Sequence, residues 1–160
     1  MDFQSRLEKA IERGRQEKAA RAREEQKKAL SQRELQRLFT QYRLELVERI
    51  EVALKQLADH FPGFRFETLV NDRGWGAAGS REDLELRGRS RKNYFSRLEM
   101  VVRPLSDAGV LELAAKGTVR NRELFHRSHY QRLAEVDITS FHEMMDLWVL
   151  EFAEAYAAES

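Results

Sequence analysis

The sequence predicts an α+β protein with a long N-terminal helix, an antiparallel sheet of about five strands, and a C-terminal amphipathic helix packed on the sheet. Three observations predict this class. Residues 2–60 contain no proline and only one glycine. After residue 63 the apolar spacing changes from a period near 3.6 to a period of 2, and a second helical pattern follows residue 140. The links between the predicted strands are short, which favours antiparallel neighbours because parallel neighbours need long crossovers.

The first part of the N-terminal helix, residues 1–34, is predicted to be a charged helical arm. It is rich in Ala, Glu, Lys, Arg and Gln, which are strong helix formers, and it has few large apolar side chains to bury. We expect the α+β domain to span residues 35–160 and to include the rest of this helix. A coiled coil is compatible with the pattern but not required, because Arg49 and Gln56 fall on core positions of the heptad.

The second part of the helix carries apolar residues at three- and four-residue steps. Such a stripe can cover a sheet or meet another helix, and we expect it to serve both its own domain and a partner chain. Pro62 and Gly63 then end the helix. The candidate oligomerisation or helix-docking face consists of Leu35, Phe39, Tyr42, Leu46, Ile50 and Leu57.

Alternating apolar and polar residues predict five strands, near residues 64–70, 82–88, 94–104, 109–119 and 123–131. Ser140 and Glu143 then form an S-x-x-E capping box, which predicts that the last helix begins there. Its apolar side chains, from Phe141 to Tyr156, share one broad face that should pack on the sheet.

The stretch Gly74-Trp75-Gly76-Ala77-Ala78-Gly79 fits the G-x-G-x-x-G spacing of a dinucleotide-binding loop. That motif has its chemical meaning only between a strand and a helix whose N-terminus faces a pyrophosphate. No crossover helix follows here, so we expect an exposed loop that joins two strands and binds no nucleotide. Trp75 has few local neighbours to cover it, which makes it a candidate contact residue for a partner.

Charge is distributed unevenly along the chain, although the net charge is only +1. Residues 1–36 carry 10 basic and 7 acidic side chains, residues 63–132 carry 14 and 9, and residues 133–160 carry none and 7. Arginine outnumbers lysine 12 to 2 in residues 63–132, which suits bidentate contacts to phosphate or carboxylate. The candidate contacts to a partner or to nucleic acid are Trp75, Arg87, Arg89, Arg91, Lys92, Tyr94, Arg120, Arg122 and Arg127.

No motif of catalysis stands out. The chain has no cysteine, so it has no thiolate nucleophile and no cysteine metal site. We expect a non-enzymatic interaction or assembly module that uses the N-terminal helix for oligomerisation or for docking a protein partner. A nucleic-acid-binding protein that uses the arginine-rich surface is the alternative. An enzyme or small-ligand binder is a third hypothesis, which a cleft that joins a histidine to two carboxylates would support. We expect no cofactor, no catalytic residues, no metal and no membrane segment, and a cytoplasmic location.

Overall fold

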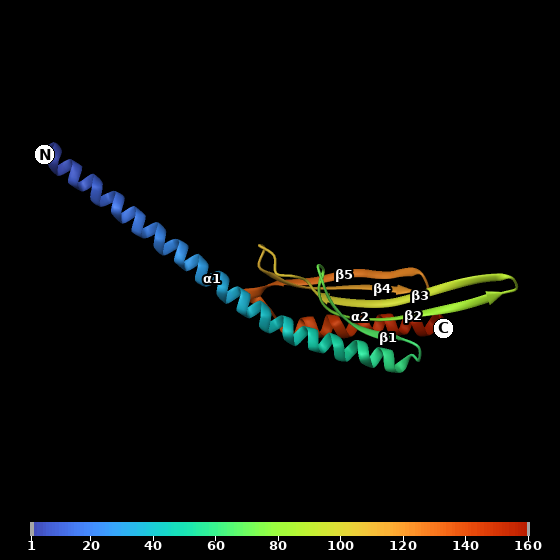
Figure 1. Cartoon of the computed structure of the whole chain (residues 1–160). Coiled ribbons are helices and arrows are strands. Elements are labelled where there is room, and N and C mark those ends of the chain that lie inside the picture. Colours follow the sequence, from blue (N-terminus) through green and yellow to red (C-terminus); the bar gives the residue numbers. More distant parts are fainter. Residues whose placement is uncertain (1, 160) are drawn as a thin grey trace. The chain divides into compact units, whose positions relative to one another are not determined.

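The computed structural model describes residues 2–159, and it describes the side chains of all of these except residues 29 and 30. One long helix, five strands and a C-terminal helix follow one another in the predicted order (Figure 1). This confirms the α+β class. The elements are α1 (Phe3–His60), β1 (Arg65–Asn71), β2 (Gly74–Arg87), β3 (Ser90–Val102), β4 (Val110–Val119), β5 (Arg122–Arg132), a short 3-10 helix (Leu133–Glu135) and α2 (Ile138–Glu159).

The chain divides by its internal contacts into two units, one that ends at Arg37 and one that begins at Leu38. We call the described part of the first unit, residues 2–37, the arm, and that of the second, residues 38–159, the head. The helix α1 supplies the whole regular structure of the arm and one of the two long helices of the head.

The five strands form an antiparallel meander in the order β1-β2-β3-β4-β5. Three of the four connections are two-residue turns, as the short links predict, because Asn71 pairs with Gly74, Arg87 with Ser90, and Val119 with Arg122. The hairpin of β2 and β3 extends beyond its neighbours. The pairing of β1 ends opposite Ser80 and that of β4 ends opposite Arg97, whereas β2 and β3 stay paired to the turn.

The core of the head lies between one face of this sheet and its two helices. Figure 1 shows α2 and the head portion of α1 on the same side of the sheet, and α2 packs against β3, β4 and β5. Because β2 and β3 expose side chains alternately to the two faces, Ala77, Leu98 and Met100 point into this core. The largest fully buried side chains are Phe39, Leu46, Ile50, Leu54, Leu98, Met100, Leu111, Leu113, Leu133, Phe141, Trp148 and Phe152.

The glycine-rich stretch is not a loop, and this part of the sequence prediction is wrong. Gly74 begins β2, and residues 74–79 pair with β1 on one side while Trp75 to Gly79 pair with β3 on the other. A Cβ atom on Gly74 would lie 2.1 Å from the carbonyl oxygen of Val102, and one on Gly76 would lie 1.9 Å from that of Met100. These two glycines therefore allow β3 to approach β2 more closely than any other residue would.

The C-terminal helix begins two residues before the predicted capping box. The cap is Asp137, whose Oδ1 accepts a hydrogen bond from the Thr139 amide at 3.2 Å. The hydroxyl of Ser140 instead donates to the Asp137 carbonyl, at 2.7 Å. Both Asp and Ser are common N-cap residues, and the observed hydrogen bonds show that Asp137 is the cap here.

Candidate docking surfaces

The arm is one exposed helix that begins with a side-chain cap. Oδ1 of Asp2 accepts a hydrogen bond from the Ser5 amide at 2.8 Å, which satisfies a backbone donor that the helix itself leaves free. Every described side chain from residue 6 to residue 34 is exposed. Helix propensity and this cap, rather than burial, therefore account for the helix here.

Three large apolar side chains lie at four-residue steps on one face of the arm, and we call them the arm stripe: Phe3, Leu7 and Ile11. Their exposed fractions are 76%, 42% and 47%. Residues four apart lie on the same side of a helix, so the three side chains form one continuous apolar surface. The stripe was not among the residues singled out from the sequence. Its signal was present in the spacing, but it is short and stands in a highly charged segment.

The sequence-predicted helix-docking face mostly faces the core of the head. Four of its six side chains have an exposed fraction of 4% or less, namely Phe39, Leu46, Ile50 and Leu57. Tyr42, also in the head, is half-buried, and so is Leu35 in the arm. The four buried side chains already have neighbours from their own chain.

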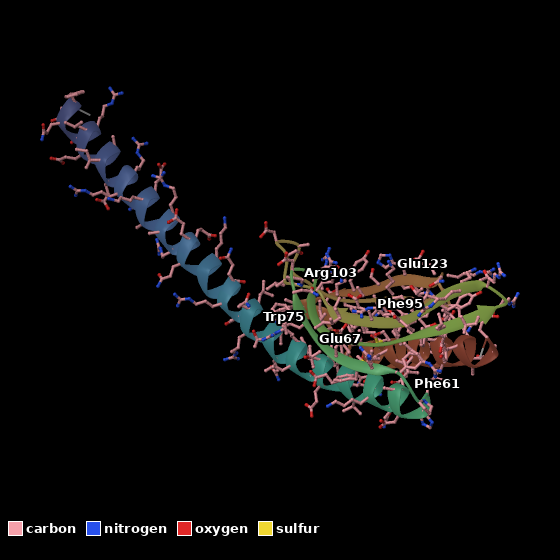
Figure 2. The ribbon with its side chains drawn as sticks, turned by 45° about the vertical axis from the view of Figure 1, so that its right-hand side comes forward. Phe61, Glu67, Trp75, Phe95, Arg103 and Glu123 are labelled. Carbon is pink, nitrogen blue, oxygen red and sulfur yellow. The ribbon has the colours of Figure 1, made fainter. Side chains whose placement is uncertain are left out.

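Trp75 packs against α1 at the start of β2 (Figure 2). Its ring lies 6.1 Å from that of Phe39, and the guanidinium of Arg43 lies 4.5 Å from its centroid. The tilted aromatic contact and the cation–π contact cover part of the ring, which is half-buried. Trp75 thus has an evident structural role, and only its remaining exposed part is available for a partner.

The end of the hairpin formed by β2 and β3, residues 84–95, carries several arginines, and we call it the arginine-rich hairpin. Its charged side chains lie on both faces of the sheet. In β3, Arg91 lies on the face turned away from the helices, beside Leu84, Leu86 and Phe95 on the same face. Lys92 lies on the opposite, helix-side face, and so does Arg87. Arg89 lies in the turn that joins the strands. All four charged side chains are exposed.

A cluster of charged and aromatic side chains lies on the helix side of this hairpin. The guanidinium of Arg120 lies 4.0 Å from the ring centroid of Tyr94, and Lys92 Nζ lies 5.0 Å from it. Arg120 also donates to Glu85 at 3.3 Å. The hydrogen bond from Arg87 to Glu85, with the charges of Arg87 and Arg120, holds the pKa of the Glu85 carboxyl below its usual value.

The β4–β5 turn sets the position of Arg120. Arg120 and Asn121 have φ angles of 47° and 70°, a conformation that costs energy for residues other than glycine. Asn121 compensates by bonding to β3: its Oδ1 accepts from the Phe95 amide and its Nδ2 donates to the Asn93 carbonyl, at 2.8 and 2.9 Å. The Arg120 amide donates to Ser96 Oγ at 2.9 Å. The roles of Ser96 and Asn121 have no signal in the sequence.

The remaining two arginines differ in their surroundings. Arg127 donates through both Nη atoms to the carboxylate of Glu151 on α2, and this hydrogen bond raises the pKa of its guanidinium. Arg122 is exposed and lines a cavity of about 710 Å³ that also includes Arg120 and Lys92. The sequence-predicted arginines therefore do not share one open face, because α2 engages Arg127 and the hairpin divides the others.

Other groups that could carry chemistry are dispersed. His129 lies on the helix side of β5 with its ring centroid 4.7 Å from that of Phe141, whereas His126 lies on the other face of the strand. Among residues 2–159, no three His, Asp or Glu side chains are grouped so that they could hold a metal ion. In the same part of the chain, no helix is long and apolar enough to cross a membrane.

The comparisons with known proteins add no assignment. No protein-family model matches the chain, and neither a curated protein nor a solved structure matches it.

Proposed function

We propose that this protein is a non-enzymatic assembly module that docks a protein partner through the arm stripe. The observation that carries the proposal is the exposure of Phe3, Leu7 and Ile11 on one face of the arm. Contiguous exposed apolar surface on a folded protein marks interaction sites far more often than single exposed residues do. A row of anchors four residues apart is how a helix binds an apolar groove on a partner.

Docking removes the exposed part of the stripe from water, and this gain offsets part of the entropy that association costs. Complete burial of one large apolar side chain contributes about 1.5–3 kcal/mol, and the stripe has three. Arg6 and Arg13, seven residues apart, lie on the same flank of the stripe, where they can pair with carboxylates on the partner. The charged remainder of the arm keeps the free helix in solution.

Site-specific photo-crosslinking tests this proposal. A photoreactive residue at position 7 of the full chain should form adducts with a protein, either in the purified sample or in an extract of the cells that make it. The matched control places the same residue at Gln16, about half a turn around the helix from Leu7, where we expect no adduct. Absence of any protein adduct from positions 3, 7 and 11 would contradict the proposal.

Nucleic-acid binding by the hairpin is the second candidate. The observation in its favour is the pair of cations over the Tyr94 ring, Lys92 and Arg120, since bases stack on aromatic rings and phosphates bind arginine. Three glutamates that line the same cavity weaken this candidate, namely Glu85, Glu123 and Glu159. The hypothesis predicts that labelled oligonucleotides bind at about 50 mM salt and dissociate at about 200 mM, and that Lys92→Ala with Arg122→Ala, which removes two exposed cations of this cavity, weakens the binding. An unchanged anisotropy at the lower salt concentration would eliminate this candidate.

The cytoplasmic location expected from the sequence remains a prediction, and localisation of a tagged full chain would test it.

A further inference from the structure

A groove runs between the two helices of the head, and its lining is suited to another helix. It has a volume of about 960 Å³ and lies between α1 and α2. Small side chains from both helices line it, namely Ala53 on α1 and Ala153 and Ala157 on α2. Small residues at a contact allow helices to approach closely.

The groove also has larger apolar side chains. Leu57 and Val149 line it, and so does Leu150, whose side chain is 64% exposed. The sheet does not cover Leu150, because the sheet-facing positions of α2 are occupied by the buried residues from Phe141 to Tyr156. An amphipathic helix laid in the groove would therefore remove from water apolar surface that the head leaves exposed.

The charge around the groove specifies which kind of helix fits. The helix α2 carries five carboxylates and no lysine or arginine. Arg49 neutralises Asp146 at one end of the groove, with 2.9 Å between Nη2 and Oδ2. Glu154 also lines the groove, and it forms no ion pair within residues 2–159. A docking helix should therefore carry cations beside its apolar face.

We propose that the arm stripe of a second copy of this chain occupies the groove. The arm combines the required features: an apolar row of three side chains, two small residues beside it in Ala10 and Gly14, and arginines 6 and 13 on one flank. Every copy of the chain carries both the stripe and the groove, so two copies hold all that the pairing needs. This inference rests on the proposed function and names the partner of the arm stripe.

The charge pattern favours a dimer in which the arm of one copy lies in the groove of the other over a dimer in which the two grooves face each other. Two copies of α2 packed against each other would bring acidic helices together, which is unfavourable. An arm can instead turn the flank that carries Arg6 and Arg13 toward that acidic surface, with Glu8 on its other flank. Because each copy has one stripe and one groove, two copies can exchange arms and leave neither apolar surface exposed.

Sedimentation velocity of the full chain over a range of concentrations tests the inference. We expect reversible dimers, and we expect Leu150→Glu to raise the dissociation constant by about tenfold or more, because it places a carboxylate on an apolar contact. The matched control is Leu147→Glu, which changes a leucine of the same helix that is 58% exposed but does not line the groove. At a concentration low enough to keep all three chains monomeric, the thermal unfolding of both variants should match that of the parent chain, which shows that the head is folded.

Cysteine cross-linking then identifies which surfaces meet. The chain has no cysteine of its own, so single substitutions are free of background. Copies carrying Ala10→Cys are mixed with differently tagged copies carrying Ala157→Cys and treated with a short bis-maleimide. We expect a covalent dimer of the two tags, and none when Gln16→Cys replaces Ala10→Cys.

The outcomes separate this inference from the proposed function. A chain that stays monomeric while position 7 captures a different protein would overturn the inference and leave the proposed function standing. So would a dimer that Leu7→Glu dissociates but Leu150→Glu does not. A chain that stays monomeric and captures nothing at position 7 would overturn both.

Discussion

The two parts of α1 are one helix by hydrogen bonding but have different physical causes. In the arm, every described side chain from residue 6 to residue 34 is exposed, so helix propensity and the cap at Asp2 maintain the structure. In the head, the same helix buries five side chains against the sheet. Most helical stability in proteins comes from such packing. One part of an unbroken helix can therefore depend on side-chain packing while another part depends on helix propensity alone. Substitutions of the same kind should affect the stability of the two parts differently.

The largest contrast is expected between glycines of the head. Gly76→Ala would place a methyl group 1.9 Å from the Met100 carbonyl oxygen, so β2 and β3 must move apart. We expect a loss of more than about 3 kcal/mol in the free energy of unfolding, at the upper end of overpacking effects. Chemical denaturation followed by tryptophan fluorescence measures it, because both tryptophans, Trp75 and Trp148, lie in the head.

Gly79→Ala is the matched control for this prediction, since it changes a glycine three residues further along β2. Its methyl group would meet only the Phe64 ring, at an ordinary distance of 3.7 Å. We expect little loss of stability, or a small gain from a stiffer unfolded chain. Equal destabilisation by the two alanines would contradict the role assigned to the close approach at Gly76.

A leucine-to-alanine pair compares the two parts of α1 directly. Leu46 is fully buried in the head, and Leu46→Ala should cost about 2–5 kcal/mol of unfolding free energy. Leu7→Ala, in the exposed arm, should change the unfolding of the head by less than about 0.5 kcal/mol. Urea titrations should be run at a low protein concentration, because association adds to the apparent stability. A large effect of Leu7→Ala under those conditions would mean that the arm supports the head.

The sequence predicts the fold class because the apolar period changes at residue 63 and the strand links are short. It fails at Gly74 to Gly79 because alternation is read from side chains, and all of these residues except Trp75 are glycine or alanine. The reason for the glycines is the backbone of β3, about 25 residues further along the chain. A contact that distant cannot be read from local spacing. The start of α2 is missed for a smaller reason, since Asp137 and Ser140 have equally suitable cap chemistry.

The candidate surfaces could be predicted only in part. Composition indicates that arginines concentrate in residues 63–132, but strand register decides that Arg91 and Lys92 face opposite ways. The bidentate contact of Arg127 depends on Glu151, which is 24 residues away. The groove between α1 and α2 has no sequence signal at all, because alanines such as Ala53 and Ala153 are ordinary helix residues. The arm stripe, by contrast, can be found in the sequence, because Phe3, Leu7 and Ile11 are spaced four residues apart in a segment with few other large apolar side chains.

A smaller effect should appear at alkaline pH and only in the head. Burial of the Tyr156 hydroxyl raises its pKa, and the nearby carboxylate of Asp83 raises it further. Because the folded head holds this proton more tightly than the unfolded chain, its contribution is complete below about pH 10 and is lost as the pH rises through the folded-state pKa. Denaturation between pH 8 and pH 11 should show a steeper decline for the parent chain than for Tyr156→Phe. Parallel declines would show that other groups control the alkaline limit.

The smallest effect is expected in the arm, and its direction is opposite to that at Gly76. A Cβ on Gly14 meets nothing within 4 Å, so Gly14→Ala adds only helix propensity. It should stabilise the arm helix by about 0.5–1 kcal/mol. We expect greater far-ultraviolet circular dichroism at temperatures below the unfolding of the head, with an unchanged tryptophan transition. Ala20→Gly should reverse the sign at another exposed position of the arm. If either substitution shifted the tryptophan transition by as much as it shifts the helical signal, the arm and the head would unfold as one unit, and the distinction between propensity and packing in α1 would not hold.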